Sequence, residues 1–176
     1  MISSTVTTGT WAIDRMNSHI SFSVRHLGML RVHGRFNDIT GRIVTAETIE
    51  ESAVSARIGA DSIDTGFPAR DGYIKGADVL AANEHKAITF NSRTIRRAGA
   101  NYLVGGELTI RGDTKPITLT VHLGGFGSDM TTGQPVLGIS AATTVKRADF
   151  DFAPQVPAAV VGADIELTFD ICARLV

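Results

Sequence analysis

Hydrophobic and polar residues alternate along most of the chain. Near the N-terminus, Ile20, Phe22 and Val24 fall on one face of an extended segment, and the residues between them are polar. This two-residue period is typical of a β-strand with one buried face. The pattern breaks at residues 27–29 and resumes over residues 30–36. The segment therefore predicts a long β-hairpin.

The same alternation recurs downstream and is clearest at the C-terminus. There Ile165, Leu167 and Phe169 share an apolar face, opposite Glu166 and Asp170. Turn-forming residues separate the runs over short distances, so consecutive strands are expected to be antiparallel neighbours. The other strand candidates are residues 11–14, 42–50, 54–58, 88–92, 102–110, 117–123 and 137–145.

One segment has a different period. Within residues 69–80, Tyr73, Ile74, Ala77 and Leu80 recur at spacings of three and four residues, which predicts one face of an α-helix. Two glycines within this helix cost about 1 kcal/mol each relative to alanine. The helix therefore needs tertiary contacts, and we expect it to dock against the sheet.

The number of one-faced strands predicts the fold class. The apolar faces must be covered, and a single helix of about three turns is too short to cover them. A sandwich would solve the problem, but the length of the last strands favours a closed sheet. The predicted fold is all-β: an extended antiparallel eight-stranded lipocalin-like barrel with one short α-helix flanking or plugging it. We expect one domain, residues 11–176, after a flexible segment, residues 1–10.

The inward faces of the strands are mostly aliphatic, with a few phenylalanines. An eight-stranded barrel is wide enough either to be filled by its own side chains or to hold one small ligand. The pattern leaves both interpretations open, and any ligand would have to be apolar. The predicted wall of the pore consists of Phe22, Val24, Phe36, Val54, Ile58, Phe90, Leu108, Leu119, Leu137, Ile139, Leu167 and Phe169.

Charge and composition exclude several classes of function. The chain has 17 Lys and Arg against 18 Asp and Glu, a formal net charge of −1, so nothing favours binding to nucleic acid. Cys172 is the only cysteine, which rules out an intramolecular disulfide. The first residues do not resemble a signal peptide, and no segment approaches the roughly 20 apolar residues of a membrane-spanning helix. We therefore expect a soluble protein located in the cytoplasm.

Three histidines, His19, His26 and His33, are spaced by seven residues, but no recognised metal-binding or nucleophile motif accompanies them. No cofactor, metal site or catalytic constellation is expected, so a non-enzymatic role is favoured. His26 shares a face with Phe22. It either has a structural role or contacts the head group of a ligand together with Arg25.

Two further polar motifs are better explained by structure than by ligand binding. Asp64, Arg70 and Asp71 surround the start of the predicted helix, and we interpret them as a cap and an ion pair that anchor it. The tripeptide Arg111-Gly112-Asp113 matches an integrin-binding motif. Its place between two strands instead indicates a hairpin turn.

An ordered set of motifs resembles the YceI-like family of polyisoprenoid-binding proteins. The motifs are WAID, NSHISFSVRHLG, VHGRF, DSIDTG, ARD, KAITFNS, GGELTIRGDTKPITLTV, TTVKRADFDF and VVGADIELTFDICA. The resemblance implies an elongated apolar pore that holds a polyisoprenoid or the tail of an isoprenoid quinone. It also implies a role in carrying, storing or sequestering this lipid, and assembly as a homodimer.

The chain departs from the family pattern at two places. Val79 and Leu80 follow Asp78 where paired aromatic residues are usual, and Asp151 replaces a usual glycine. Two alternatives also remain. The barrel could be an enzyme acting on the isoprenoid or quinone, with His26 as acid or base, or a fully packed interaction domain without a ligand.

Overall fold

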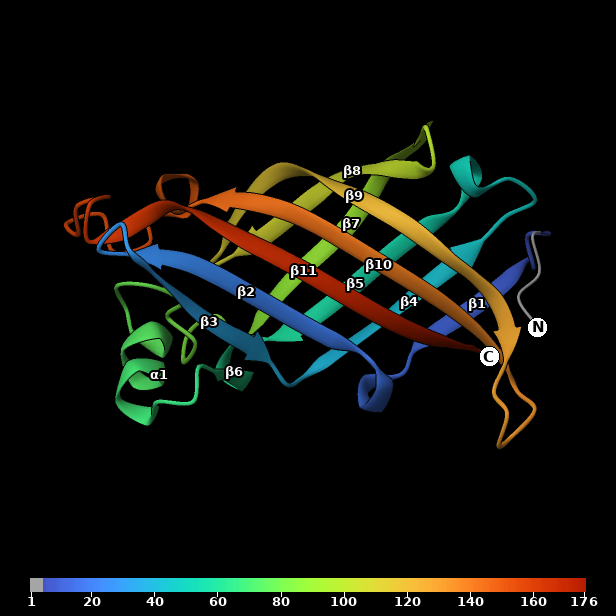
Figure 1. The fold of residues 1–176 in the computed structure, drawn as a ribbon, viewed down its shortest axis with the longest axis horizontal. Helices are drawn as coiled ribbons and strands as arrows, with labels where there is room; N and C mark the ends of the chain where they lie inside the picture. The colour runs from blue at the N-terminus through green and yellow to red at the C-terminus, as the bar shows by residue number, and fades with distance from the viewer. Residues whose placement is uncertain (1–4) are drawn as a thin grey trace.

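The computed structural model describes residues 5–176 and shows an elongated barrel of antiparallel strands (Figure 1). Residues 1–4, part of the segment expected to be flexible, lie outside the described residues. The strands are β1 (Gly9–Ile13), β2 (His19–His26), β3 (Leu30–Phe36), β4 (Ile39–Thr45), β5 (Ala53–Gly59), β6 (Ile63–Asp64), β7 (Ala87–Ala98), β8 (Asn101–Ile110), β9 (Asp113–Ser128), β10 (Pro135–Lys146) and β11 (Val161–Leu175). The helices are α1 (Pro68–Lys75) and the 3-10 turns η1 (Arg15–Asn17), η2 (Ile49–Glu51), η3 (Ala60–Ser62) and η4 (Arg147–Phe150).

The sheet closes on itself through β11. This strand pairs with β10 along one edge, and along the other edge it pairs first with β2 and then with β1. Three of the barrel strands are interrupted, and each consists of two successive segments: β1 and β2, β3 and β4, and β5 and β6. The eleven segments therefore form eight barrel strands. The predicted antiparallel eight-stranded barrel is confirmed. The predicted hairpin is also confirmed, as β2 and β3.

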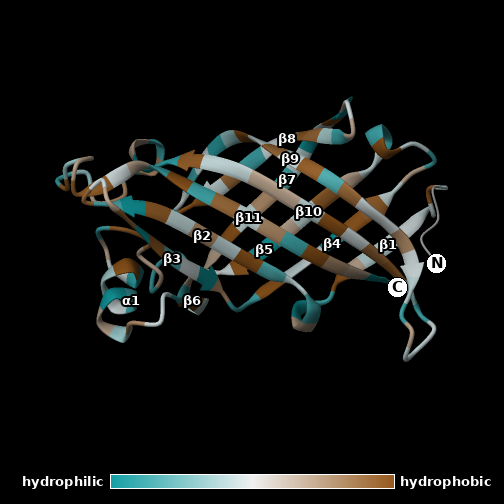
Figure 2. Ribbon diagram, in the orientation of Figure 1, coloured by the Kyte–Doolittle hydropathy of each residue, from teal (hydrophilic) through white to brown (hydrophobic). Residues whose placement is uncertain are grey.

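Hydrophobic and hydrophilic residues alternate along the strands (Figure 2), and the hydrophobic ones line the interior of the barrel. Along β8 this gives a regular sequence in which Val104, Leu108 and Ile110 are buried. A second group of buried residues, around Trp11 and Phe126, lies where β1 meets β11. The barrel wall therefore has one apolar surface, and that surface faces inward.

The helix is shorter than its sequence pattern predicted. α1 ends at Lys75, because Gly76 adopts an extended conformation and its N–H bonds to the carbonyl of Tyr73. Residues 77–80 form turns, and Leu80 is buried without belonging to the helix. The strand expected over residues 42–50 likewise ends early, at Thr45, and η2 follows it.

Thr65 connects the helix to β6. Asp71 accepts hydrogen bonds from the backbone N–H (2.9 Å) and the hydroxyl (2.5 Å) of Thr65, and Arg70 donates to the Thr65 hydroxyl (2.9 Å). Asp64 instead pairs with Arg35, at 3.1 Å. Arg70 and Asp71 anchor the helix through these hydrogen bonds, whereas the predicted ion pair is wrong for them, because neither forms one within residues 5–176. The predicted side-chain cap is wrong, because Phe67 occupies the N-cap position and makes no such bond.

Candidate functional site

The interior of the barrel contains two neighbouring cavities. The first has a volume of about 130 Å3 and the second about 100 Å3. Each is several times larger than the roughly 10–15 Å3 that one water molecule needs. The side chains of Ile58, Leu108, Leu167 and Phe169 line both cavities, so these four residues form the boundary between them. The two cavities therefore adjoin inside the barrel.

The walls of both cavities are almost entirely apolar. The second cavity is lined by aliphatic and phenylalanine side chains alone, and the first adds only Thr45, Ser52 and Tyr102. The Thr45 hydroxyl is already engaged, because it donates to the carbonyl of Thr7 (2.6 Å) and accepts from the indole N–H of Trp11 (2.8 Å). An apolar cavity of this kind excludes water and accommodates hydrocarbon.

The side chains in the middle of the barrel are only partly covered by protein atoms. On β9, Ile117, Leu119, Val121 and Leu123 point inward and are nevertheless only half-buried. In a filled interior such residues would be packed on all sides. The alternative of a fully packed barrel therefore does not match the structure.

A compact segment, residues 147–161, lies at the end of the barrel beside the second cavity, and we call it the cap. Within it Phe150 is 1% exposed, and its ring stacks on that of Phe152 at 5.7 Å between centroids. Phe152 in turn lines the second cavity. The cap is connected to the turn after α1, because the N–H of Ala153 bonds to the carbonyl of Asp78 at 2.7 Å. Val79 and Leu80, from that turn, also line this cavity.

Arg147 holds the cap together. Its side chain is 8% exposed and donates hydrogen bonds of 2.8–3.0 Å to five backbone carbonyls, those of Phe152, Ala153, Val156, Val161 and Gly162. Asp151 adopts a left-handed conformation (φ 52°) within the same segment. This conformation favours glycine and explains why glycine is usual in the family motif.

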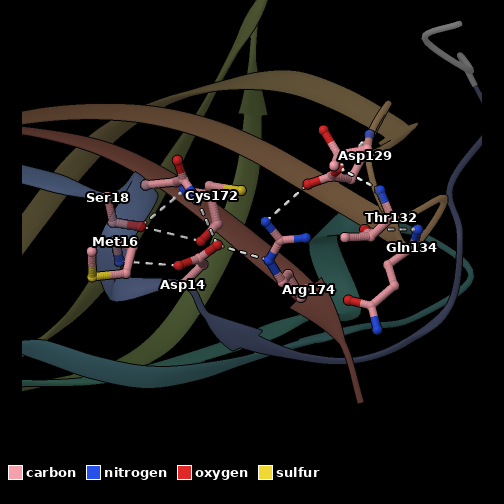
Figure 3. A network of polar contacts seen from close by, with 10 residues as sticks. Asp14, Met16, Ser18, Asp129, Thr132, Gln134, Cys172 and Arg174 are labelled. Atoms are coloured by element: carbon pink, nitrogen blue, oxygen red, sulfur yellow. Dashed lines mark hydrogen bonds and ion pairs between the residues drawn. The ribbon is translucent and has the colours of Figure 1, made fainter.

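A polar network lies at the opposite side of the cavities, where β11 passes from β2 to β1 (Figure 3). Arg174 contacts Asp14 at 2.7 Å and Asp129 at 3.0 Å. The backbone N–H groups of Thr132 and Thr131, together with Arg174, lower the pKa of Asp129 to about 2. Hydrogen bonds from Asn17 and Arg174 lower the pKa of Asp14.

Cys172 belongs to the same region but has no sign of reactivity. Its backbone exchanges two hydrogen bonds of 3.1 Å with the hydroxyl of Ser18. Burial and the nearby Asp14 carboxylate raise the pKa of its thiol, so the thiolate is disfavoured. The network connects η1, the turn after β9 and β11, and we interpret it as structural.

Eleven of the twelve residues predicted to form the pore wall line a cavity. Val54, Phe90, Leu119, Leu137 and Ile139 line the first, Phe22 and Phe36 the second, and Ile58, Leu108, Leu167 and Phe169 both. The exception is Val24, which is half-buried between Val32 and Ile165 outside both cavities. Whether these residues contact a ligand stays a prediction.

The two predicted head-group contacts lie away from the cavities. Arg25 is exposed, and neither it nor His26 contributes to a cavity wall. Sequence analysis missed Ile74, Val79 and Phe152, because they reach the second cavity from segments outside the regular strands. It also omitted Tyr102, although its alternation with Val104 placed it on the inward face.

Within residues 5–176, no three His, Cys, Asp or Glu side chains gather in a way that could hold a metal ion. None of the helices in this range has the length and apolar character needed to cross a membrane.

Sequence comparison finds similar proteins in several bacteria. The YceI-like domain matches residues 11–173. A UPF0312 protein of Ectopseudomonas mendocina is 34% identical over 145 residues, which cover 80% of this chain and 75% of the relative. A UPF0312 protein of Pectobacterium atrosepticum is 32% identical over 160 residues, covering 89% and 82%.

Solved structures share the fold. BcnA of Burkholderia cenocepacia superposes with a TM-score of 0.82 at 20% identity, covering 91% of this chain and 98% of BcnA. A YceI protein of Campylobacter jejuni gives 0.75 at 26% identity, covering 85% and 88%. A domain of Saccharophagus degradans, described as polyisoprenoid binding and implicated in plant cell wall breakdown, gives 0.68 at 15% identity, covering 97% and 100%. With the match over residues 11–173, these similarities show that the chain belongs to the YceI-like family.

Proposed function

We propose that this protein binds one long isoprenoid chain, a polyprenyl lipid or the tail of an isoprenoid quinone, inside its barrel. The observation that carries the proposal is the pair of adjoining apolar cavities within a closed sheet. The Saccharophagus degradans domain, described as polyisoprenoid binding, has the same fold and adds support. In this role the protein carries, stores or sequesters the lipid without transforming it.

Burial of hydrocarbon supplies the binding energy. Each Å2 of apolar surface removed from water contributes about 25 cal/mol, so a few hundred Å2 gives several kcal/mol before ordering costs. The walls offer no charged group to an ionic head, so the polar end of the ligand has to remain outside both cavities. A flexible, uncharged chain fits both requirements.

Extraction tests the proposal directly. Protein purified from several hosts is extracted with organic solvent, and the extract is analysed by mass spectrometry. We expect an isoprenoid lipid at a stoichiometry close to one per barrel. Repeatedly empty extracts, together with no binding of added polyprenol, would contradict the proposal.

A narrowing substitution tests whether the cavity is the binding site. Ala141 lines the first cavity, and its neighbour Ala142 is exposed on the outer face of β10. We expect Ala141→Phe to abolish polyprenol binding with a loss of stability below about 1 kcal/mol, because the ring enters empty space. The control Ala142→Phe should bind normally. A filled interior would instead make Ala141→Phe destabilising by about 1–3 kcal/mol.

The enzymatic alternative has no support in the geometry. His26, the proposed acid or base, lies outside both cavity walls. We expect His26→Ala to leave the bound lipid unchanged in identity and amount.

The cytoplasmic location and the homodimer stay predictions.

A further inference from the structure

The capped end of the barrel carries exposed apolar side chains on two adjacent segments. The turn between β2 and β3 presents Leu27, which is 48% exposed, and Met29, which is 76% exposed, followed by the exposed Leu30. The backbone N–H of Leu27 bonds to the carbonyl of Val160 at 2.9 Å, so this turn lies against the cap. Figure 1 shows both segments at the same end of the molecule.

The cap itself presents a second apolar surface. Residues 152–161 contain no charged side chain, and residues 157–160 are exposed. The segment begins at Phe152, which lines the second cavity, and ends next to the β2–β3 turn. A stretch of chain without charged side chains therefore runs from the cavity wall to the exposed surface.

The backbone of the turn adds an independent observation. Leu27 (φ 54°) and Gly28 (φ 68°) are both left-handed, and the N–H of Met29 bonds to the carbonyl of His26, which defines a type I′ turn. Such turns favour Asn, Asp or Gly at both central positions. A bulky leucine is strained there, so the turn itself does not explain its presence.

One arginine that makes no ion pair within the described residues lies at the base of the same turn. Arg25 and Arg31 are direct cross-strand partners, an arrangement in which like charges repel. Arg31 pairs with Glu166 at 3.1 Å. Arg25 is exposed and makes no ion pair with a carboxylate of residues 5–176. An external anion would complement this charge.

We propose that residues 27–30 and 157–160 dock on a lipid bilayer that contains anionic head groups. The apolar side chains enter the interfacial region, and Arg25 contacts lipid phosphates. Docking would hold the end beside the second cavity against the membrane, where an isoprenoid lipid could enter or leave. This purpose rests on the proposed lipid-binding function, whereas docking itself can be measured with vesicles alone.

Co-sedimentation of the full chain with vesicles tests the inference. The vesicles contain phosphatidylcholine alone or phosphatidylcholine mixed with phosphatidylglycerol. We expect the wild type to bind the mixed vesicles. The affinity for these vesicles should fall roughly tenfold or more in Met29→Asp, and in Arg25→Gln it should depend less on phosphatidylglycerol. The matched control is Met130→Asp, at a fully exposed methionine in the turn after β9 at the far end, and it should bind normally.

A second variant separates docking from folding. Leu27→Asn suits the type I′ turn, so it should raise the Tm while it weakens vesicle binding. Absence of wild-type sedimentation, or an equal loss in Met29→Asp and Met130→Asp, would overturn the inference. The inference would also be overturned if the wild type formed dimers, did not bind vesicles, and became monomeric in Met29→Asp. A second copy of the chain would then cover the surface. Vesicle binding by protein whose extracts contain no lipid and which does not bind added polyprenol would refute the proposed function and leave docking standing.

Discussion

At the scale of single residues, Arg147 shows how one charge can organise an apolar region. Its guanidinium is buried and forms no ion pair with a carboxylate of residues 5–176, and five backbone carbonyls supply the compensating partial charges. Three of those carbonyls belong to the irregular segment between η4 and β11, and the other two belong to the first residues of β11. Without Arg147, buried acceptors of this region would be left unsatisfied. The side chain thus fixes the shape of the cap and, through Phe152, one wall of the second cavity.

Replacement of this side chain should be costly. We expect Arg147→Met to lower the free energy of unfolding by more than about 3 kcal/mol, because several buried carbonyls lose their donors. Urea unfolding followed by circular dichroism measures the change. The control Arg96→Met, at an exposed position on β7, should stay within about 0.5 kcal/mol of the wild type. A similar loss in both variants would show that Arg147 has no special role.

Arg174 and its two carboxylates predict a dependence of stability on pH. The folded pKa of Asp129 is about 2, and that of Asp14 is also lowered, so folding favours the ionised forms. Their contribution is complete above the unfolded pKa of about 3.9 and is lost as the pH falls toward 2. We therefore expect the Tm to fall over this range. In Asp129→Asn the fall should be shallower, and an unchanged slope would exclude Asp129 as a cause.

At the scale of elements, β1 closes the barrel with few pairs. Its backbone ladder with β11 has three pairs, at Trp11, Ala12 and Ile13, and it pairs with β4 on its other side. Trp11 is fully buried, and its ring lies 5.6 Å from that of Phe126. Side-chain packing therefore reinforces the closure at this short ladder.

Removal of the indole should weaken the closure. We predict that Trp11→Ala lowers the free energy of unfolding by about 3–5 kcal/mol, as expected for a large aromatic side chain lost from a core. Thermal unfolding measures the loss, and hydrogen exchange should show the largest gain in amides of β1. Uniform changes throughout the barrel would argue against a local role in closure.

At the scale of the whole molecule, the empty apolar interior lowers the free energy of unfolding, and a ligand that fills it raises this free energy again. A ligand that binds only the folded barrel stabilises it by about 2.7 kcal/mol at one hundred times its Kd. We expect added polyprenol to raise the Tm of delipidated protein in proportion to the logarithm of its concentration. Ala141→Phe should show no such shift, and an equal shift in that variant would place the ligand outside the first cavity.

Much of the cavity wall could be predicted because it lies on regular strands. Leu108, Leu119 and Leu167 follow a strict two-residue period, so their inward direction followed from the sequence. Val24 follows the same period, yet it lies outside the cavities, next to the irregularity in the pairing of β2 with β11 between Val161 and Ile165. Residues on turns, such as Leu80 and Phe152, have no period from which their direction could be inferred.

The sequence alone determined that this chain is an all-β protein whose antiparallel strands each bury one apolar face, because that face must be covered. The length of the last strands favoured a closed barrel over a sandwich, and the pairing of β11 with both β10 and β2 shows the closure. The sequence also determined that the interior is apolar. Only the tertiary structure decided that this interior stays partly empty, since free volume depends on how side chains from distant strands meet. The tertiary structure also decided that Arg147 ties the cap, through carbonyls of a segment that has no sequence period. It likewise decided that Arg174 joins Asp14 to Asp129, two residues that lie far from it in the chain.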